Sequence, residues 1–274
     1  MSLYNKIFTK FAGYSITQKF LENATIELQQ LMGIGMGGNV KTSGELIALK
    51  ILKKNFDPPY TIFDVGANKG QYCNMVLNYL SNDDISIHCF EPCSYTFSLL
   101  KKHTQNYDNS NRKKIFINNH SLGRYEGTHP IYYDQKGSGL ASFSKRKLDH
   151  FGIKFDLSEQ VEVGTVENYC RTNSVSMINL LKLDVEGHEL DVLLGGYNML
   201  RDGMINTVVF EFGGCNIDSR TYFQDFYYFF KDINMKLFRI TPSGYLHVIN
   251  SYKELYEQFV TTNFLAIYNG LSVK

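Results

Sequence analysis

Four acidic side chains stand at the ends of short apolar runs, and their types and positions make them the first candidates for chemistry. They are Asp64, Glu91, Asp184 and Glu211. Because the carboxyl ends of parallel strands meet at one edge of a sheet, we expect these carboxylates to form a row along that edge. Carboxylates there can accept hydrogen bonds from hydroxyl groups, remove protons or balance a positive charge.

The glycine turn after Asp64 narrows the class of ligand. Gly66 and Gly70 form G-x-x-x-G between an apolar strand and a helical pattern that runs from Tyr72 to Leu80. Strand, turn and helix are typical of the first unit of a nucleotide-binding α/β sheet, but this spacing differs from the G-x-G-x-x-G that seats a pyrophosphate. A carboxylate would repel a phosphate, so Asp64 indicates a ligand end that is cationic or donates hydrogen bonds. S-adenosylmethionine, with its ammonium and sulfonium groups and no phosphate, fits this requirement.

Glu91 ends the second expected strand, 27 residues beyond Asp64. An acid at this position can accept both ribose hydroxyls of an adenosine group. Pro92 suits the first turn of the following helix, and Glu91 could alternatively only cap that helix and favour its dipole. Ser121 and Leu122 end the third strand, where they either meet the adenine edge or simply lead into a turn.

The fourth expected strand delivers Asp184 to its carboxyl end, beside the strand that carries Asp64. Glu186, His188 and Glu189 follow within five residues, and so many ionisable groups are costly unless they are solvated, paired or used. We expect Asp184 to face the methyl donor or acceptor and His188 to be a candidate base near neutral pH, although most histidines are structural. Glu189 is expected to favour the N-terminus of the next helix.

Glu211 lies among apolar neighbours at the end of the fifth strand. Partial desolvation there raises the pKa of a carboxyl group or requires a partner. We predict that Glu211 orients the substrate or acts as general base. Asp184, Glu186 and Glu211 could alternatively share a divalent cation, but acids at strand tips do not establish a metal site, and none is assigned.

Strand and helix patterns alternate from Tyr60 onwards, which favours a mainly parallel sheet covered on both faces. Strands are expected at 60–66, 85–91, 115–121, 179–185, 205–212, 235–240 and 263–268. Helices are expected at 70–80, 93–106, 165–173, 188–201 and 219–233. The glycine-rich stretch 122–164 breaks the alternation with short β-type pieces at 130–134, 140–144 and 160–164, so it predicts an insertion of hairpin character suited to substrate contact.

Residues 1–57 are expected to form a helical cap before a larger α/β domain at 58–274. An amphipathic helix spans Ile16 to Leu31, and a T-x-x-E capping box at Thr42 and Glu45 predicts a second helix that ends near Lys54. The cap either covers one sheet edge or closes over a ligand through Gly37, Gly38 and residues 43–45. In the insertion, the basic run 145–147 is either a solvated loop or a contact for an anionic glycan or a phosphate.

Composition limits the setting. The 274 residues carry a formal net charge of +1, with a pI of about 7.6, so no global field attracts nucleic acid or membrane. Five cysteines in a chain of this size favour reduced thiols, and no apolar run approaches the roughly 20 residues of a membrane span. We expect a cytoplasmic protein without stable membrane insertion.

The order of the motifs resembles the FkbM family of S-adenosylmethionine-dependent methyltransferases over roughly residues 60–268. The motifs are Phe63-Asp-Val-Gly-Ala-Asn-Lys-Gly-Gln71, Phe90-Glu-Pro92, Leu183-Asp-Val-Glu-Gly-His-Glu189 and Phe210-Glu-Phe212. The resemblance implies an α/β class I methyltransferase fold, a Rossmann-like sheet of seven strands with the last antiparallel. It also implies methyl transfer to an oxygen, often a sugar hydroxyl of a glycan, glycolipid or secondary metabolite.

The resemblance carries cofactor roles onto six residues, namely Asp64, Gly66, Asn68, Gly70, Glu91 and Asp184. Five neighbours complete the expected cofactor-binding set, namely Ala67, Tyr72, Pro92, Ser121 and Leu122. The family pattern fixes no general base, so the candidates remain Asp184, Glu211 and His188.

The expected reaction is direct in-line displacement, in which the protein positions the reactants and a base removes the acceptor's proton. Two alternatives stay open. A nicotinamide-dependent sugar oxidoreductase could use the same sheet but should have a tighter G-x-G turn, and a non-catalytic cofactor-binding protein could keep the fold without turnover.

Overall fold

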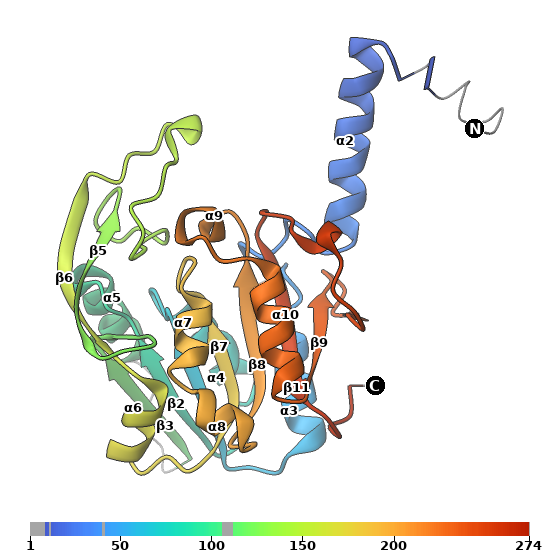
Figure 1. Ribbon diagram of the computed structural model, residues 1–274. Coiled ribbons are helices and arrows are strands. Elements are labelled where there is room, and N and C mark those ends of the chain that lie inside the picture. Colours follow the sequence, from blue (N-terminus) through green and yellow to red (C-terminus); the bar gives the residue numbers. More distant parts are fainter. Residues whose placement is uncertain (1–8, 11, 40–41, 106–111, 274) are drawn as a thin grey trace.

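An eight-stranded, mostly parallel sheet with helices on both faces organises the chain (Figure 1). The structure is a computed structural model that describes residues 9–10, 12–39, 42–105 and 112–273. The strands are β1 (Tyr60–Val65), β2 (Ile85–Phe90), β3 (Lys113–Asn118), β4 (Ser121–Leu122), β5 (Gly127–Tyr133), β6 (Leu157–Gly164), β7 (Ile178–Leu183), β8 (Ile205–Phe212), β9 (Met235–Ile240), β10 (Leu246–Val248) and β11 (Thr262–Tyr268). The α-helices that lie fully within the described residues are α2 (Ser15–Leu31), α3 (Leu46–Asn55), α4 (Gln71–Tyr79), α5 (Ser94–Thr104), α6 (Val166–Thr172), α7 (Glu189–Leu194), α8 (Tyr197–Arg201), α9 (Cys215–Ser219) and α10 (Phe223–Asp232).

The strand order confirms the expected α/β class and corrects one detail. The sheet runs β10-β9-β11-β8-β7-β1-β2-β3, and β1 lies between two parallel neighbours, β2 and β7. The last strand, β11, is antiparallel to both β8 and β9, as predicted. The predicted count of seven strands is wrong, because the three-residue β10 pairs antiparallel with β9 at the edge of the sheet.

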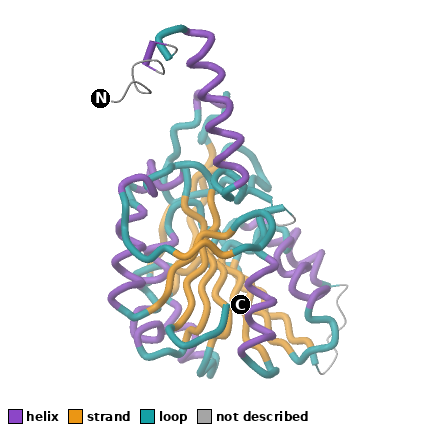
Figure 2. Tube along the Cα trace, turned by 90° about the vertical axis from the view of Figure 1, so that its right-hand side faces the viewer, coloured by secondary structure: helices purple, strands orange, loops and turns teal. Residues whose placement is uncertain are grey.

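Side chains on the central strands alternate between two separate cores, one on each face of the sheet. Phe63 and Val65 of β1 pack with helices α6, α7, α8 and α10, whereas Ile62 packs with α3 and α4 on the opposite face. Figure 2 shows helices on both sides of the twisted strands. Since side chains alternate with a period of two, Asp64 lies on the α3/α4 face, as does Lys182, its register partner on β7.

Two predicted helices differ in their bounds, and one of them is divided in two. The 188–201 segment forms α7 and α8, separated at Gly195 and Gly196. A Cβ at Gly195 would lie 2.0 Å from the carbonyl oxygen of Gly123, so this close approach requires glycine. The 219–233 segment is preceded by the short α9, and the aromatic helix α10 buries Phe223, Phe226 and Phe230 as expected for a core-facing stripe.

The 122–164 stretch forms the expected hairpin-like insertion. It makes a second sheet of order β4-β6-β5, in which β5 and β6 pair antiparallel. The predicted strand at 140–144 is reduced to a single bridge between Tyr132 and Ser142. The loop between β5 and β6 therefore remains irregular where it passes above the edge of the main sheet (Figure 1).

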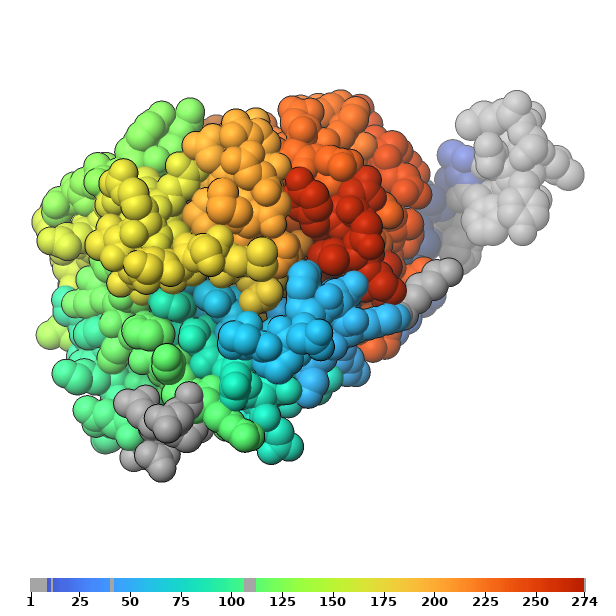
Figure 3. Space-filling view, turned by 90° about the horizontal axis from the view of Figure 1, so that it is seen from below, coloured from blue at the N-terminus to red at the C-terminus, as the bar shows by residue number. Residues whose placement is uncertain are grey.

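The N-terminal segment contains the two expected helices, but the capping box is wrong. Helix α2 extends away from the rest of the molecule (Figures 1 and 3), whereas α3 packs against the main sheet. Glu45 takes up an αR conformation before α3, and its carboxylate accepts from the Ser43 hydroxyl at 2.8 Å rather than from the backbone of Thr42. At its far end, α3 lies beside the C-terminal segment (Figure 3), where Asn55 and Ser272 exchange two hydrogen bonds.

Two chemical features of the fold bear on the sequence analysis. All five cysteines are buried and free, which confirms the expected reduced thiols. Within the described ranges, helices fall short of the length and apolar character needed to cross a membrane.

Candidate active site

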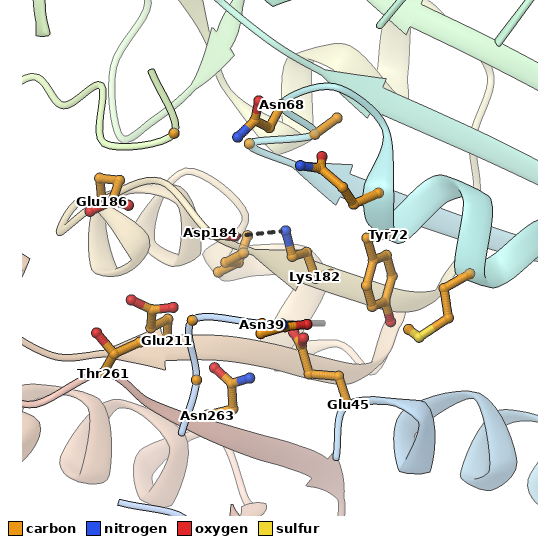
Figure 4. Close-up of a pocket in the computed structure, with 18 of the residues that line it drawn as sticks. Asn39, Glu45, Asn68, Tyr72, Lys182, Asp184, Glu186, Glu211, Thr261 and Asn263 are labelled. Carbon is orange, nitrogen blue, oxygen red and sulfur yellow. Dashed lines mark hydrogen bonds and ion pairs between the residues drawn. The ribbon is translucent and has the colours of Figure 1, made fainter. Parts of the chain in front are cut away.

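Two adjoining cavities open at the carboxyl edge of the sheet. The larger has a volume of about 1110 Å³ and the smaller about 50 Å³. They share the walls contributed by Gly66, Asn68, Gly139, Asp184 and Glu186. The turn after β1 and the end of β7 therefore stand between two spaces, and a ligand lying across them would extend in both directions from Asp184 (Figure 4).

The turn after β1 approaches the end of β7 very closely. Gly66 has φ +80°, and a Cβ there would lie 1.8 Å from the carbonyl oxygen of Asp184, so only glycine fits. Gly70 has φ +88° and precedes α4. A Cβ there would point towards Leu100, and Gly70 lines neither cavity. Gly66 therefore forms part of the cavity walls, whereas Gly70 contributes only to the turn before α4.

A buried cation organises the acids around this turn, and it corrects the role expected for Asp64. Lys182 Nζ lies 3.3 Å from Asp64 Oδ1 and 3.2 Å from Asp184 Oδ2. The Asp64 side chain is fully buried and contributes to neither cavity wall. Burial raises the pKa of the Asp64 carboxyl group, and the charge of Lys182 opposes that rise. The positive charge that faces Asp64 thus comes from the protein itself, not from a ligand.

Lys182 remains charged because of these acids. Burial alone would lower the pKa of its ammonium group, but Asp184, Asp64 and Glu45 together raise it. Its Nζ also lies 5.5 Å from the centre of the Tyr72 ring. The sequence signal for this residue is a lysine inside an otherwise apolar strand, Leu180-Leu-Lys-Leu183, and no role was predicted for it.

Glu91 stands at the end of β2 on the wall of the smaller cavity. Its Oε2 accepts from the backbone N–H of Asn68 at 3.0 Å, and its Oε1 accepts from that of Cys93 at 3.0 Å. The second bond is to the residue that precedes α5 and not to an N–H group of that helix. Burial raises the pKa of the Glu91 carboxyl group to about 7. Pro92 and Ser121 line the same cavity, whereas Leu122 is buried in the core of the sheet.

Glu211 lies on the floor of the larger cavity, at the end of β8. Its partner in the antiparallel register is Asn263 of β11, which also lines the cavity. Figure 4 shows Glu211 and Asn263 below Asp184 and Lys182. Burial raises the pKa of the Glu211 carboxyl group strongly, and Asp184 and Glu186 add to the effect. Glu211 forms no ion pair with a described basic group, so its carboxyl oxygens are available to a ligand in the cavity.

The structure separates His188 from the other two candidate bases. One ring nitrogen, Nε2, lies 3.2 Å from Ser144 Oγ, and Nδ1 lies 3.1 Å from Asp191 Oδ2. His188 lines neither cavity, so it does not meet Asp184 and Glu211 at a common point. Glu189 accepts from the backbone N–H groups of Val185 and Gly187, which agrees with its expected structural role at the start of α7.

The insertion contributes Arg146 to the cavity wall. Arg146 Nη1 lies 2.5 Å from Glu186 Oε2, and Arg146 Nε lies 3.6 Å from Asp218 Oδ2. Its side chain is 8% exposed, so the expectation of a solvated basic loop is wrong for this residue. Burial raises the pKa of Glu186 to about 8 although Arg146 opposes the shift. The positive charge of Arg146 is therefore already balanced by two carboxylates.

The N-terminal segment supplies another part of the wall. Gly37, Gly38, Asn39 and Glu45 line the larger cavity together with Thr261. The Gly37 N–H donates to the carbonyl oxygen of Thr261 at 2.9 Å, which ties the glycine turn to the strand that carries Asn263. Of the two interpretations of this segment, the described geometry favours the one in which it closes over the site. Burial raises the pKa of Glu45 to about 7.

Among the described residues, no group of three or more His, Cys, Asp or Glu side chains is arranged to hold a metal ion. The three carboxylates considered as shared metal ligands have different surroundings. Asp184 pairs with Lys182, Glu186 pairs with Arg146, and Glu211 faces the cavity.

The raised carboxyl pKa values predict that stability falls with increasing pH. Glu45 and Glu91 each have a pKa of about 7 in the folded protein, against an ordinary value of 4.5. Their contribution to the free energy of unfolding is therefore complete below pH 4.5 and is lost as the pH rises through about 7. The pKa of His88 is lowered to about 4 by burial, which opposes this trend only below about 6.5. Between pH 6.5 and 8, where Glu186 with its pKa of about 8 also titrates, we expect the free energy of unfolding to fall by about 2 kcal/mol per pH unit, measured by denaturant titration without ligand.

Glu45→Gln provides the control for this pH dependence, since it removes one titrating group and should flatten the slope between pH 6.5 and 8. A slope unchanged in this variant, or a wild-type protein that gains stability with rising pH in this range, would contradict the assigned shifts.

The chain is similar in sequence to known methyltransferases. A family model described as the methyltransferase FkbM domain matches residues 64–240. The 2-O-methyltransferase NoeI of Sinorhizobium fredii is 26% identical over 186 residues, which cover 65% of this chain and 75% of NoeI. The hexuronic acid methyltransferase AglP of Haloferax volcanii is 26% identical over 172 residues, which cover 61% of this chain and 62% of AglP.

Among solved structures, the methyltransferase FkbM from Methylobacillus flagellatus aligns with a TM-score of 0.46 and 12% sequence identity. The alignment covers 94% of this chain and 61% of that chain. This chain therefore spans less than two thirds of both AglP and the Methylobacillus protein.

Proposed function

Because this chain belongs to the FkbM methyltransferase family, as the match over residues 64–240 shows, we propose that it transfers the methyl group of S-adenosylmethionine to a hydroxyl oxygen of a sugar. The names of its relatives favour this choice, since one is a 2-O-methyltransferase and the other acts on a hexuronic acid. The observation that carries the proposal is the placement of Glu91 and Glu211 in two cavities that meet at Asp184.

The residues of the smaller cavity suit the adenosine end of the cofactor. The Glu91 carboxylate accepts two backbone bonds but is a four-site acceptor, so it retains capacity for ribose hydroxyls. Asn68 Oδ1 is buried without a described hydrogen-bond partner beside it. Pro92 and Ser121 would border the base. When bound, the cofactor supplies a methyl group already activated by its sulfonium.

The insertion must shift to admit a nucleoside. At about 50 Å³, the smaller cavity is well below the roughly 300 Å³ at which ligand sites begin. Ser138, Gly139, Ala141 and Phe143 of the β5–β6 loop line it, and the Ser142 hydroxyl donates to the carbonyl oxygen of Glu186 at 2.7 Å. We infer that cofactor binding breaks or moves this contact, a loop adjustment of the kind common at binding sites.

Glu211 and Asp184 are assigned different roles at the acceptor end of the site. Glu211 would take the proton of the acceptor hydroxyl, and the bound cofactor would supply the methyl group that this oxygen receives. Glu211 is the better base of the two because Asp184 is already paired with Lys182. A positive charge brought into the cavity would favour the ionised form of Glu211. Asp184 would orient the reacting groups, and the N-terminal cap at 1–57 would close the cavity of the 58–274 domain.

Glu211→Gln should lower kcat for methyl transfer by about 10²–10⁴-fold while leaving the affinity for S-adenosylhomocysteine nearly unchanged. Glutamine keeps the size and polarity of the side chain but cannot take the proton. The measurement is initial-rate kinetics of S-adenosylhomocysteine release, paired with calorimetric binding of that product. His188→Ala is the matched control, because His188 lies outside both cavities and its removal should leave kcat within a few fold. Full turnover by Glu211→Gln, or its loss only in His188→Ala, would reject Glu211 as the base.

A further inference from the structure

The larger cavity continues beyond the residues needed for methyl transfer, along one face of α4. Gln71, Asn74, Met75, Asn78 and Tyr79 line this extension. Their spacing places them on one stripe of the helix, and eight residues of helix span about 12 Å. This arm leads away from Asp184 and Glu211, so atoms bound there take no part in the reaction.

The side chains of the arm are neutral and suited to sugar rings. Gln71, Asn74 and Asn78 carry amides that both donate and accept, which matches the dual character of hydroxyl groups, and Asn78 Nδ2 donates to Asn74 Oδ1 at 3.2 Å. Tyr79 and Met75 add apolar surface against which the carbon face of a ring can pack. Nearer the reaction centre, the Tyr72 hydroxyl and the Asn263 amide nitrogen are buried without a described hydrogen-bond partner, and both residues line the cavity. Buried polar groups of this kind are normally satisfied, so a ligand rich in hydroxyls is the expected partner.

The charges on the wall disfavour an anionic acceptor. Four carboxylates line the cavity, namely Glu45, Asp184, Glu186 and Glu211. The described basic residues on the wall are Lys182 and Arg146, and both are already paired with two carboxylates each. A sugar carboxylate would therefore find each described cation on the wall already balanced by two carboxylates.

We propose that the acceptor is a neutral oligosaccharide, with the methylated sugar at Asp184 and Glu211 and at least one further sugar along α4. This rests on the proposed methyl transfer to a sugar and specifies its substrate class. The arm along α4 recognises the length of the oligosaccharide, and the paired charges of the wall select against an anionic one.

The test compares initial rates of S-adenosylhomocysteine release by the full chain with three sets of acceptors. These are neutral di- to tetrasaccharides of common hexoses and N-acetylhexosamines, the corresponding monosaccharides, and oligosaccharides of the same lengths that contain a uronic acid. We expect transfer to one or more neutral oligosaccharides, with kcat/KM at least tenfold above the matching monosaccharide and at least tenfold above the matching uronate. A preference for uronates, equal use of monosaccharides, or no transfer to any neutral oligosaccharide would overturn the proposal.

Variants localise the effect to the arm. Asn78→Ala should raise KM for the preferred oligosaccharide about fivefold without changing KM for its monosaccharide. Lys101→Ala, at an exposed position on α5 outside the cavity, should change neither. An Asn78→Ala variant that alters both acceptors equally would place the second sugar elsewhere. Calorimetry with S-adenosylhomocysteine separates the two levels: failure to bind it refutes the proposed function, whereas binding with the wrong acceptor preference refutes this inference alone.

Discussion

Replacing Glu91 by glutamine is expected to weaken binding of S-adenosylhomocysteine by about 100-fold. A carboxylate that accepts from two ribose hydroxyls makes hydrogen bonds to a charged group, each worth about 1.5–3 kcal/mol, and glutamine loses the charge and one acceptor oxygen. A loss of about 3 kcal/mol corresponds to that factor in Kd. Isothermal titration calorimetry measures it directly, with thermal unfolding of the free variant to exclude a folding defect.

Glu159→Gln is the matched control for the Glu91 variant. Glu159 also accepts hydrogen bonds near the start of α5, from the backbone and hydroxyl of Ser94, but it lines neither of the two site cavities. Its replacement should leave the affinity for S-adenosylhomocysteine unchanged. Equal affinities for the wild-type protein and Glu91→Gln would remove Glu91 from the cofactor site.

The same assignment has a pH signature. Because burial raises the pKa of Glu91 to about 7, lowering the pH through this value protonates the carboxylate that accepts from ribose. Affinity for S-adenosylhomocysteine should therefore fall as the pH drops from 8 to 6 in the wild-type protein. The pH dependence should be weaker in Glu91→Gln.

Lys182→Met is expected to cost about 3–5 kcal/mol of folding free energy, because it leaves Asp64 without its cation inside the protein. The Asp64 side chain is fully buried, and Lys182 Nζ at 3.3 Å is its described counter-charge. The loss should shrink at low pH, since protonation of Asp64 then removes the uncompensated charge. Chemical denaturation at pH 7.5 and pH 5 gives both values.

Two further variants make this prediction specific. Asp64→Asn combined with Lys182→Met should recover at least half of the lost stability, because the buried charge is removed with its partner. Lys53→Met breaks a comparable lysine–aspartate pair at the surface, where Lys53 Nζ lies 2.8 Å from Asp83 Oδ2, and should cost far less. If Lys182→Met is no more harmful than Lys53→Met, or if the double variant is less stable than the single one, Lys182 does not neutralise Asp64.

Local sequence signals predicted much of the fold. Apolar runs that alternate with helical patterns located the central strands, and β1, β2, β7 and β8 carry their acids at the predicted ends. The missed features depend on contacts that are distant in sequence. β10 has three residues and exists because it pairs with β9, and the break between α7 and α8 reflects the approach of Gly195 to Gly123.

The errors at the site have a common physical origin. Asp64 was expected to face a cationic ligand because a carboxylate would repel a phosphate, whereas the described cation beside it, Lys182, comes from β7 through strand register. His188 shares a motif with Asp184, but a turn with positive φ at Glu186 and Gly187 lies between them. The His188 side chain therefore contacts Ser144 and Asp191 and not the cavities. The sequence thus locates which strand ends carry acids, but not which side chains reach the cavities.

The most direct test of the proposed activity is transfer of a deuterated methyl group from labelled S-adenosylmethionine to the neutral oligosaccharide panel, followed by mass spectrometry of the products. We predict that the label appears on a sugar oxygen with the wild-type protein and falls by at least 100-fold with Glu211→Gln. No label on any saccharide with the wild-type protein, when the monosaccharides and uronate oligosaccharides are tested beside the neutral panel, or a label that persists unchanged in the Glu211 variant, would contradict methyl transfer to a sugar hydroxyl by this site.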